Sequence, residues 1–361
     1  MSIPHGLSWS AARLALVAAC LLFAAIGAAA QAAPSSETPA AAATAPSESA
    51  SDAEATRRLT HASNAVVGVL VQALDNANSA ATLGKARQGS GVVIGSDGLV
   101  LTIGYLILEA DQVQLVTDDG RLIPARVVGY DVATGFGLVQ ALIPLPLGAV
   151  PLGDPAGISD DETLVVISGG AGAGLSPARR VSRRAFSGYW EYHIDGALFT
   201  APARTDHSGA ALFNLRGELL GVGSLVVSDA LGPGAPRMNG NMFVPVDLLK
   251  PILAELRSRG RSAQSQRAWM GVNCIEDEGE VRVLRVTRKS PADEAGLEPG
   301  DLIQRIDGAP VDSLGKLWKT LWSGGAPERD VTLDVQRSGK PLQLRLHTVD
   351  RDKAIKKPEG T

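Results

Sequence analysis

The hydrophobic positions of residues 57–260 fall in short runs that are separated by turn residues. These runs are predicted strands: Ala65–Val71, Gly91–Ile94, Leu99–Thr102, Val113–Val116, Ala125–Val128, Leu138–Leu142, Leu164–Ser168 and Leu219–Val227. The segment Gly95-Ser96-Asp97-Gly98, between the second and third runs, is typical of a hairpin turn. Strands at this spacing, without long amphipathic helices between them, indicate a mainly β domain built as a sandwich or barrel.

The period of the pattern changes after this region. Asp247 is a candidate N-cap for a helix that Gly260 ends, since the apolar residues between them recur at helical spacing. A polar linker, residues 261–267, leads to a second unit, residues 268–350, and a tail, residues 351–361. In the second unit we expect strands at Gly271–Cys274, Glu280–Thr287, Leu302–Ile306, Val331–Gln336 and Leu342–His347. Helices are expected after the N-cap Ser290 and at Leu314–Trp322.

The N-terminus has the features of an export signal. Arg13 precedes an apolar run that ends in small residues near Ala30, which is typical of a secretory signal peptide, assigned to residues 1–32. The alternative is an uncleaved membrane anchor. Residues 33–56 are mostly Ala, Pro, Ser, Thr and Glu, so we expect a disordered linker. The expected location is periplasmic or secreted, with no stable membrane span once the signal is cleaved.

Composition narrows the choice of partners. The 361 residues carry a formal charge of −4, which offers no field to attract nucleic acid. Four arginines between Arg179 and Arg184 lie beside aromatic residues, and in an acidic chain a solvated strand face or a site for an acidic partner is the better interpretation. Only Cys20 and Cys274 are present, so the mature chain has no internal disulfide and Cys274 is expected to be a buried apolar residue. No metal-ligand spacing and no cofactor motif is found.

Three segments resemble one known family. They are Gly89–Thr102, Phe243-Val244-Pro245-Val246-Asp247 and Ser290–Ile303, the last of which is close to the PDZ signature. The chain is similar, from about Val66 to His347, to the HtrA/Deg family of trypsin-like proteases with a C-terminal PDZ domain. This resemblance implies a two-barrel, chymotrypsin-fold domain at residues 57–260 followed by a peptide-binding PDZ domain at residues 268–350.

The resemblance assigns the catalytic positions one residue at a time. Ser208, in Asp206-His207-Ser208-Gly209, stands at the nucleophile position. Tyr105 stands where the family has its catalytic histidine, and Gly135 where it has its aspartate. Asp206 replaces the glycine of the oxyanion hole, where a carboxylate would repel the developing charge.

A serine hydroxyl attacks only when an oriented base removes its proton. A tyrosine is mostly protonated at neutral pH and replaces imidazole poorly. Loss of the triad is worth about 10⁶-fold, which leaves on the order of one turnover per day. His207 is adjacent to Ser208, but neighbouring side chains usually point apart, and nothing in the sequence places His61, His193 or His347 beside the serine. We therefore expect a pseudoprotease, and the alternative is an active endopeptidase that uses Ser208 with a non-standard base.

The PDZ unit has an intact signature. The resemblance places the carboxylate-binding loop at Trp269-Met270-Gly271-Val272 and lines the groove with Leu317 and Leu321, with Trp318 as a further candidate. Core packing is the alternative role for both leucines. The expected ligands are unfolded peptides or protein C-termini of exported proteins, in quality control or regulation. A subunit that modulates an active paralogue, in a homo- or hetero-oligomer, is a third hypothesis.

Overall fold

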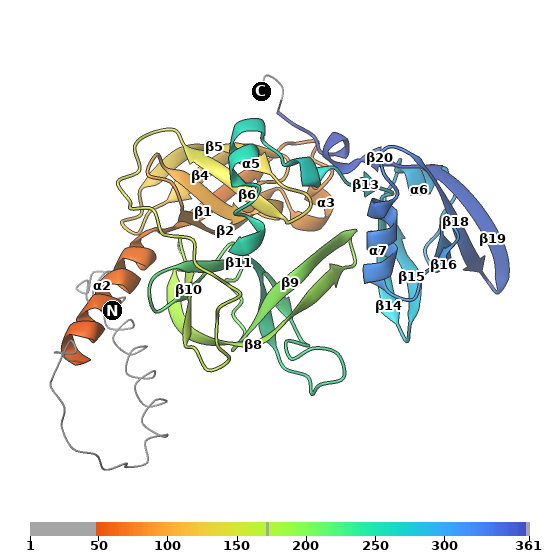
Figure 1. Ribbon diagram of the computed structural model, residues 1–361. Coiled ribbons are helices and arrows are strands. Elements are labelled where there is room, and N and C mark those ends of the chain that lie inside the picture. The colour runs from red at the N-terminus through yellow and green to blue at the C-terminus, as the bar shows by residue number, and fades with distance from the viewer. Residues whose placement is uncertain (1–47, 171–172, 359–361) are drawn as a thin grey trace, which may run out of the picture.

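The computed structural model describes residues 48–170 and 173–358, so the signal and most of the linker lie outside the described residues. Two closed β-barrels are followed by a smaller unit with its own sheet and core (Figure 1). The predicted mainly β, two-barrel architecture of the N-terminal domain is confirmed. None of the helices in these described ranges is long and apolar enough to cross a membrane.

The first barrel has the strand order β1-β2-β3-β6-β5-β4. Its strands are β1 (Val66–Ala73), β2 (Ala86–Val93), β3 (Leu99–Ile103), β4 (Ala110–Val116), β5 (Leu122–Tyr130) and β6 (Phe136–Ala141). Short helices, α3 (Ala80–Leu83) and α4 (Gly104–Ile107), interrupt the connections. Every residue of β3 is buried, because this strand packs in the barrel core against β2 and β6. Helix α4 follows β3 directly and thereby places Tyr105 at the barrel's end.

The second barrel has the order β10-β11-β12-β9-β8-β7. Its strands are β7 (Leu164–Ser168), β8 (Gly174–Gly188), β9 (Tyr192–Ala201), β10 (Ala211–Asn214), β11 (Leu219–Val227) and β12 (Gly240–Pro245). The β8–β9 hairpin is the longest and extends from the barrel toward the C-terminal unit (Figure 1). It is missing from the expected strands: β8 is rich in arginine and lacks a long apolar run, although β9 contains the buried run Ala197-Leu198-Phe199.

The C-terminal unit contains a sheet of order β14-β15-β16-β18-β19. The elements are β13 (Ala268–Trp269), β14 (Val272–Asp277), β15 (Glu280–Val286), α6 (Pro291–Glu294), β16 (Leu302–Ile306), β17 (Ala309–Pro310), α7 (Leu314–Ser323), β18 (Asp330–Arg337), β19 (Lys340–His347) and β20 (Val349–Asp350). The Ser290 cap is confirmed, since its side chain accepts a hydrogen bond from the Asp293 N–H. Cys274 is completely buried in β14, as expected. Burial raises the pKa of its thiol.

Two expectations are wrong. Helix α2 (Glu48–Asn64) occupies part of the predicted disordered linker. Alanines favour a helix there, Glu54 pairs with arginines three and four residues on, and the buried Leu59 anchors the helix on the barrel. The helix predicted from Asp247 to Gly260 is divided into a 3₁₀ turn, η2 (Val246–Leu248), and α5 (Leu253–Arg259). Pro251 lies between them and disfavours helical geometry in the residue before it. Gly260 ends α5 with φ of 74°, as predicted.

The two domains contact each other extensively. The linker between them contains the 3₁₀ turn η3 (Ala263–Ser265), and the Ser265 hydroxyl accepts a hydrogen bond from the Val132 N–H of the first barrel. After β20, the 3₁₀ turn η4 (Arg351–Ala354) leads back to the same barrel, where the Lys356 N–H donates to Glu109 Oε1. The C-terminal unit is therefore fastened to the protease-like domain at both of its ends.

Candidate functional site

The structure brings Ser208 and Tyr105 together. Ser208 lies in the loop between β9 and β10, and the hydroxyl oxygens of the two residues are 2.7 Å apart. The Tyr105 hydroxyl is also 2.9 Å from the Ser224 carbonyl oxygen, which can only accept a hydrogen bond. A phenol has one proton, so donation to Ser224 leaves Ser208 to donate toward Tyr105. The serine proton then points to a group that is itself fully protonated.

Tyr105 is a poor base at this position. Burial raises its pKa to about 12, and the hydrogen bond with Ser208 opposes that rise only in part. At neutral pH about one molecule in 10⁵ carries the phenolate. The contact between Tyr105 and Ser208 therefore holds the serine in place without activating it.

The four described histidines are engaged elsewhere. His61 lies 3.2 Å from the Ala149 carbonyl oxygen, and His347 pairs with Asp330. His207 is adjacent to Ser208, but its Nδ1 is 3.1 Å from the Thr205 carbonyl oxygen, and burial lowers its pKa. His193 lies in the β8–β9 hairpin between Ser187 and Asp195. None of the ring hydrogen bonds among these residues reaches Ser208.

Asp206 belongs to a half-buried polar network beside the serine. Its carboxylate accepts hydrogen bonds from Arg204 Nε, at 2.9 Å, and from the Ser168 hydroxyl. Burial disfavours its ionised form, but these hydrogen bonds and the charge of Arg204 outweigh burial and lower its pKa. The negative charge of Asp206 is thus balanced by the Arg204 guanidinium. The hydrogen bond from Ser168 links the Ser208 loop to β7. Asp206 is not among the residues of the described chain that have a positive φ.

Gly135 lies in a tight loop between β5 and β6. Its φ is 82°, and its carbonyl accepts a hydrogen bond from the Gly104 N–H at 2.7 Å, next to Tyr105. A Cβ at Gly135 would lie 3.1 Å from the Tyr192 hydroxyl. Asp131 is the nearest acid in this loop, but its carboxylate is used by the Thr134 N–H and hydroxyl and by the Ser262 hydroxyl. Gly135 therefore has a backbone conformation that favours glycine, and Asp131 stabilises the loop through its hydrogen bonds.

The second candidate site is the predicted carboxylate-binding loop, and a side chain of the same protein occupies it. The N–H groups of Met270, Gly271 and Val272 donate to the Glu191 carboxylate at 3.1, 2.7 and 2.9 Å. Glu191 comes from the tip of the β8–β9 hairpin and is only 2% exposed. Burial raises its pKa, and Arg351 together with the three N–H groups opposes that rise. Three converging amide donors form the type of site that binds a peptide's terminal carboxylate.

The rest of the tip runs between β14 and α7. The Cys274 N–H of β14 donates to the Tyr189 carbonyl at 2.8 Å. On the other side, Trp318 Nε1 of α7 donates to the Gly188 carbonyl at 2.9 Å. Leu317 and Leu321 are completely buried in the core of the C-terminal unit. Trp318, the further candidate, is the α7 side chain that hydrogen-bonds the tip.

Glu191 was not identified as a functional residue from the sequence. An acid between two aromatic residues, Trp190 and Tyr192, is ordinary for a hairpin tip, and its partners lie about 80 positions further along the chain. Three of the four arginines of β8 form ion pairs with acids of the chain. Arg180, Arg183 and Arg184 pair with Asp160, Asp247 and Asp229, respectively. Acidic groups of the chain itself therefore occupy these arginines.

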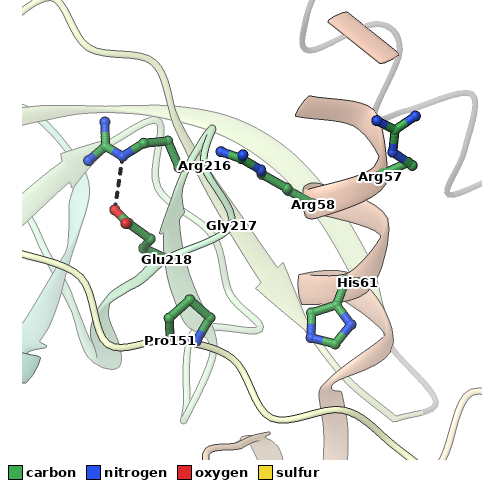
Figure 2. Close-up of a pocket in the computed structure, with 7 residues that line it drawn as sticks. All are labelled: Arg57, Arg58, His61, Pro151, Arg216, Gly217 and Glu218. Carbon is green, nitrogen blue, oxygen red and sulfur yellow. Dashed lines mark hydrogen bonds and ion pairs between the residues drawn. The ribbon is translucent and has the colours of Figure 1, made fainter. Parts of the chain in front are cut away.

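A third feature is a surface cleft of about 400 Å³ between α2 and the β10–β11 turn (Figure 2). It is lined by Arg57, Arg58, His61, Pro151, Arg216, Gly217 and Glu218. Its cations have carboxylate partners: Arg58 pairs with Glu54, and Arg216 with Glu218, as the dashed line in Figure 2 shows. The cleft contains no serine or cysteine, and we assign it no chemistry.

Comparison with protein-family models identifies both domains. A trypsin-like peptidase domain matches residues 89–222, and a PDZ domain matches residues 268–348. The predicted fold class, a mainly β trypsin-like domain followed by a PDZ domain, is therefore confirmed.

The curated relatives are serine proteases by name. The chain is 26% identical over 296 residues to a putative serine protease HhoA of Synechocystis, which covers 73% of this chain and 71% of the relative. It is also 26% identical over 273 residues to the periplasmic pH-dependent serine endoprotease DegQ of Escherichia coli, which covers 72% of this chain and 58% of that one. The chain thus spans little more than half the length of the Escherichia coli relative.

Among solved structures, the chain resembles an HtrA-type protease AlgW with a tripeptide. The TM-score is 0.50 at 22% identity, and the match covers 85% of this chain and 98% of the other. A variant of that protease with a tripeptide gives a TM-score of 0.52 at 21% identity, over 82% and 97% of the two chains. At this identity the likeness establishes the fold.

Proposed function

We propose that this chain, whose two domains match a trypsin-like peptidase domain and a PDZ domain, is an exported, peptide-binding relative of the HtrA/DegP serine proteases and that its protease domain does not hydrolyse peptide bonds. Relatives named as periplasmic endoproteases support a periplasmic location. The serine is retained, and its activation is lost.

One observation carries the proposal. The group that touches Ser208 Oγ is the Tyr105 hydroxyl, at 2.7 Å, and burial raises the pKa of this phenol to about 12. General-base catalysis by a positioned group contributes about 10²–10⁴-fold, and a group with so high a pKa is in the wrong protonation state at pH 7. The position that resembles the family's aspartate adds a second fault, since Gly135 has no side chain and a left-handed backbone.

The PDZ domain supplies the binding activity in this proposal. Its loop presents three N–H groups to a carboxylate, and β14 has a main-chain donor, Cys274 N–H, that can pair with an added strand. Structures of HtrA-type proteases with bound peptides support the same ligand class for this chain. We expect free C-termini of unfolded or misassembled exported proteins to be the ligands.

The hydrolytic part of the proposal is tested with the mature protein beside a Ser208→Ala variant. Both are incubated with a fluorophosphonate probe and with unfolded casein, and trypsin serves as the positive control. We expect equal, background labelling and cleavage for the two proteins. Labelling and cleavage that disappear in Ser208→Ala would show an active endopeptidase with a non-standard base. That result would overturn the pseudoprotease proposal.

A further inference from the structure

We propose that the tip of the β8–β9 hairpin, residues 188–191, is an internal ligand of the PDZ groove, and that a C-terminal peptide binds only after it displaces this tip. The inference rests on the proposed function, because it concerns access to the same peptide-binding groove. It adds the identity of the competitor and the residue, Glu191, on which the competition depends.

The first argument is the chemistry of the loop. Both carboxylate oxygens of Glu191 are engaged: Oε1 accepts from Gly271 and Val272, and Oε2 accepts from Met270. A peptide's terminal carboxylate needs the same three N–H groups, and each N–H group has one proton to donate. Glu191 and a terminal carboxylate therefore exclude each other.

The second argument is the spacing of the contacts. A peptide that extends a sheet as an antiparallel strand makes main-chain hydrogen bonds at every second residue. The tip has one such main-chain bond and places its carboxylate at the same spacing. The Glu191 side chain accepts from the Val272 N–H. Two residues before Glu191, the Tyr189 carbonyl accepts from the N–H of Cys274, two residues after Val272. The tip thus runs along β14 as a bound peptide would.

The third argument is that the opposite wall of the groove takes part. Trp318 of α7 donates to the Gly188 carbonyl, and Lys319 of α7 forms an ion pair with Asp195 of β9 at 3.1 Å. Contacts on both β14 and α7 place the tip within the groove rather than beside it. Figure 1 shows the end of the hairpin reaching α7 and β14.

The tip is also held in shape by ring stacking within the hairpin and by Arg351 of η4. The rings of Trp190 and Tyr192 are stacked with centroids 5.6 Å apart, and Arg351 Nη1 donates to the carbonyls of Trp190 and Glu191. A preformed ligand in the same chain has an effective concentration in the millimolar range. A free peptide competes at that disadvantage until the tip leaves.

The test compares full-length mature protein with Glu191→Gln, which keeps the size of the side chain and removes its charge. The matched control is Glu278→Gln. Glu278 is an exposed glutamate with φ of 49° at the β14–β15 turn, and Glu191 has φ of 54°. Arg351→Gln, which loosens the tip without altering the groove, is a second variant.

Two measurements are made on each protein. Hydrogen–deuterium exchange of residues 270–274 reports protection of the loop amides. An array of peptides with free C-termini, printed beside the same peptides amidated, reports binding. With Glu191→Gln we expect these amides to exchange about tenfold faster or more, and free-carboxylate peptides to bind about tenfold tighter or more, because a larger fraction of the grooves is open. Glu278→Gln should match the wild type in both measurements.

The outcomes separate the inference from the proposed function. If wild type and Glu191→Gln bind free-carboxylate peptides equally well, the groove is not blocked; the internal-ligand proposal is then wrong and peptide binding stands. Unchanged amide exchange in both Glu191→Gln and Arg351→Gln would also overturn it. If no variant binds any peptide, or amidation changes nothing, the proposed PDZ function itself fails, and the inference fails with it.

Discussion

The Ser208 site and the PDZ groove differ in what contacts them. At Ser208 the contacting group is the Tyr105 hydroxyl, whose pKa is raised by burial, so it is a poor base for the serine. In the groove all the binding groups are present and another part of the same chain satisfies them. In the functions proposed for this chain, the first site is inactive because of the identity of its residues, and the second is blocked by a reversible contact. The proposed protein would bind peptides without cleaving them, once the hairpin tip leaves the groove.

The largest expected effect is a loss of stability on substitution of Gly271, which tests how tightly the carboxylate-binding loop is packed. In Gly271→Ala the new Cβ would lie 2.2 Å from the Ser290 Cβ, at φ of 88°. We expect unfolding of the C-terminal unit to become easier by about 3 kcal/mol, through left-handed strain and overpacking. Chemical denaturation measures this change. The control is Gly279→Ala, with φ of 80° and a nearest atom 4.0 Å away, which should lose only about 1 kcal/mol. Equal losses would contradict the steric account.

The second prediction tests whether Ser208 becomes active when a better base is placed beside it. Tyr105→His returns an imidazole to the serine, and we expect fluorophosphonate labelling and casein cleavage to rise by about 10²-fold over the wild type. Full activity should not return, because Gly135 supplies no carboxylate to orient the ring. Tyr105→Phe is the control and should give no gain. If Tyr105→His with Ser208→Ala is as active as Tyr105→His alone, the gained activity does not come from Ser208.

The third prediction concerns the cation that holds the tip. Arg351→Gln removes the guanidinium bonds to Trp190 and Glu191, and we expect the protein to lose about 2 kcal/mol of stability, since hydrogen bonds to charged groups are worth that much when partly buried. Denaturation in urea measures the loss. Arg345→Gln, on the exposed face of β19, serves as the control and should stay within about 0.5 kcal/mol of the wild type. A comparable loss in both variants would refute the assignment.

The smallest effect is a pH dependence of the hairpin's docking. Burial lowers the pKa of His193, and the hydrogen bond to Asp195 opposes that shift only in part. The neutral ring is thus favoured in the docked state, so its stabilisation is complete above the ordinary histidine pKa of about 6.5 and is lost as the pH falls below it. We expect the thermal midpoint of the wild type to fall more than that of His193→Gln between about pH 7.5 and pH 5.5. Parallel curves for the two proteins would exclude this role.

Much of the fold could be predicted from the sequence, because it depends on local patterns. Apolar runs located Leu164–Ser168 and Leu219–Val227 to the residue, and Ser290 with its following proline located a helix start. Strand β8 could not be found in this way. Its arginines lie at exposed or half-buried positions and leave no long apolar run, and the charges of Arg183 and Arg184 are matched by acids far along the chain.

The candidate sites show the same difference between residues that lie in local motifs and residues whose partners are distant in the sequence. Ser208, Tyr105 and the loop at Met270–Val272 lie in recognisable motifs, and the structure brings the first two within 2.7 Å. The correspondence of Tyr105 and Gly135 to a lost histidine and aspartate stays a prediction. Glu191 lies in no motif, and its role arises only when a hairpin from one domain meets a loop from the other. Pairings across such sequence distances leave no local pattern to read.

The left-handed backbone of Glu191 belongs to the hairpin turn itself. Gly188 pairs with Tyr192, so the loop between them has three residues, and such loops commonly end in a residue with a positive φ. The φ of 54° at Glu191 is therefore set by the turn and does not depend on contact with the PDZ domain. The carboxylate is presented on a preformed turn, so docking costs little ordering of the backbone. In the internal-ligand proposal, the groove would close again readily after a peptide is released.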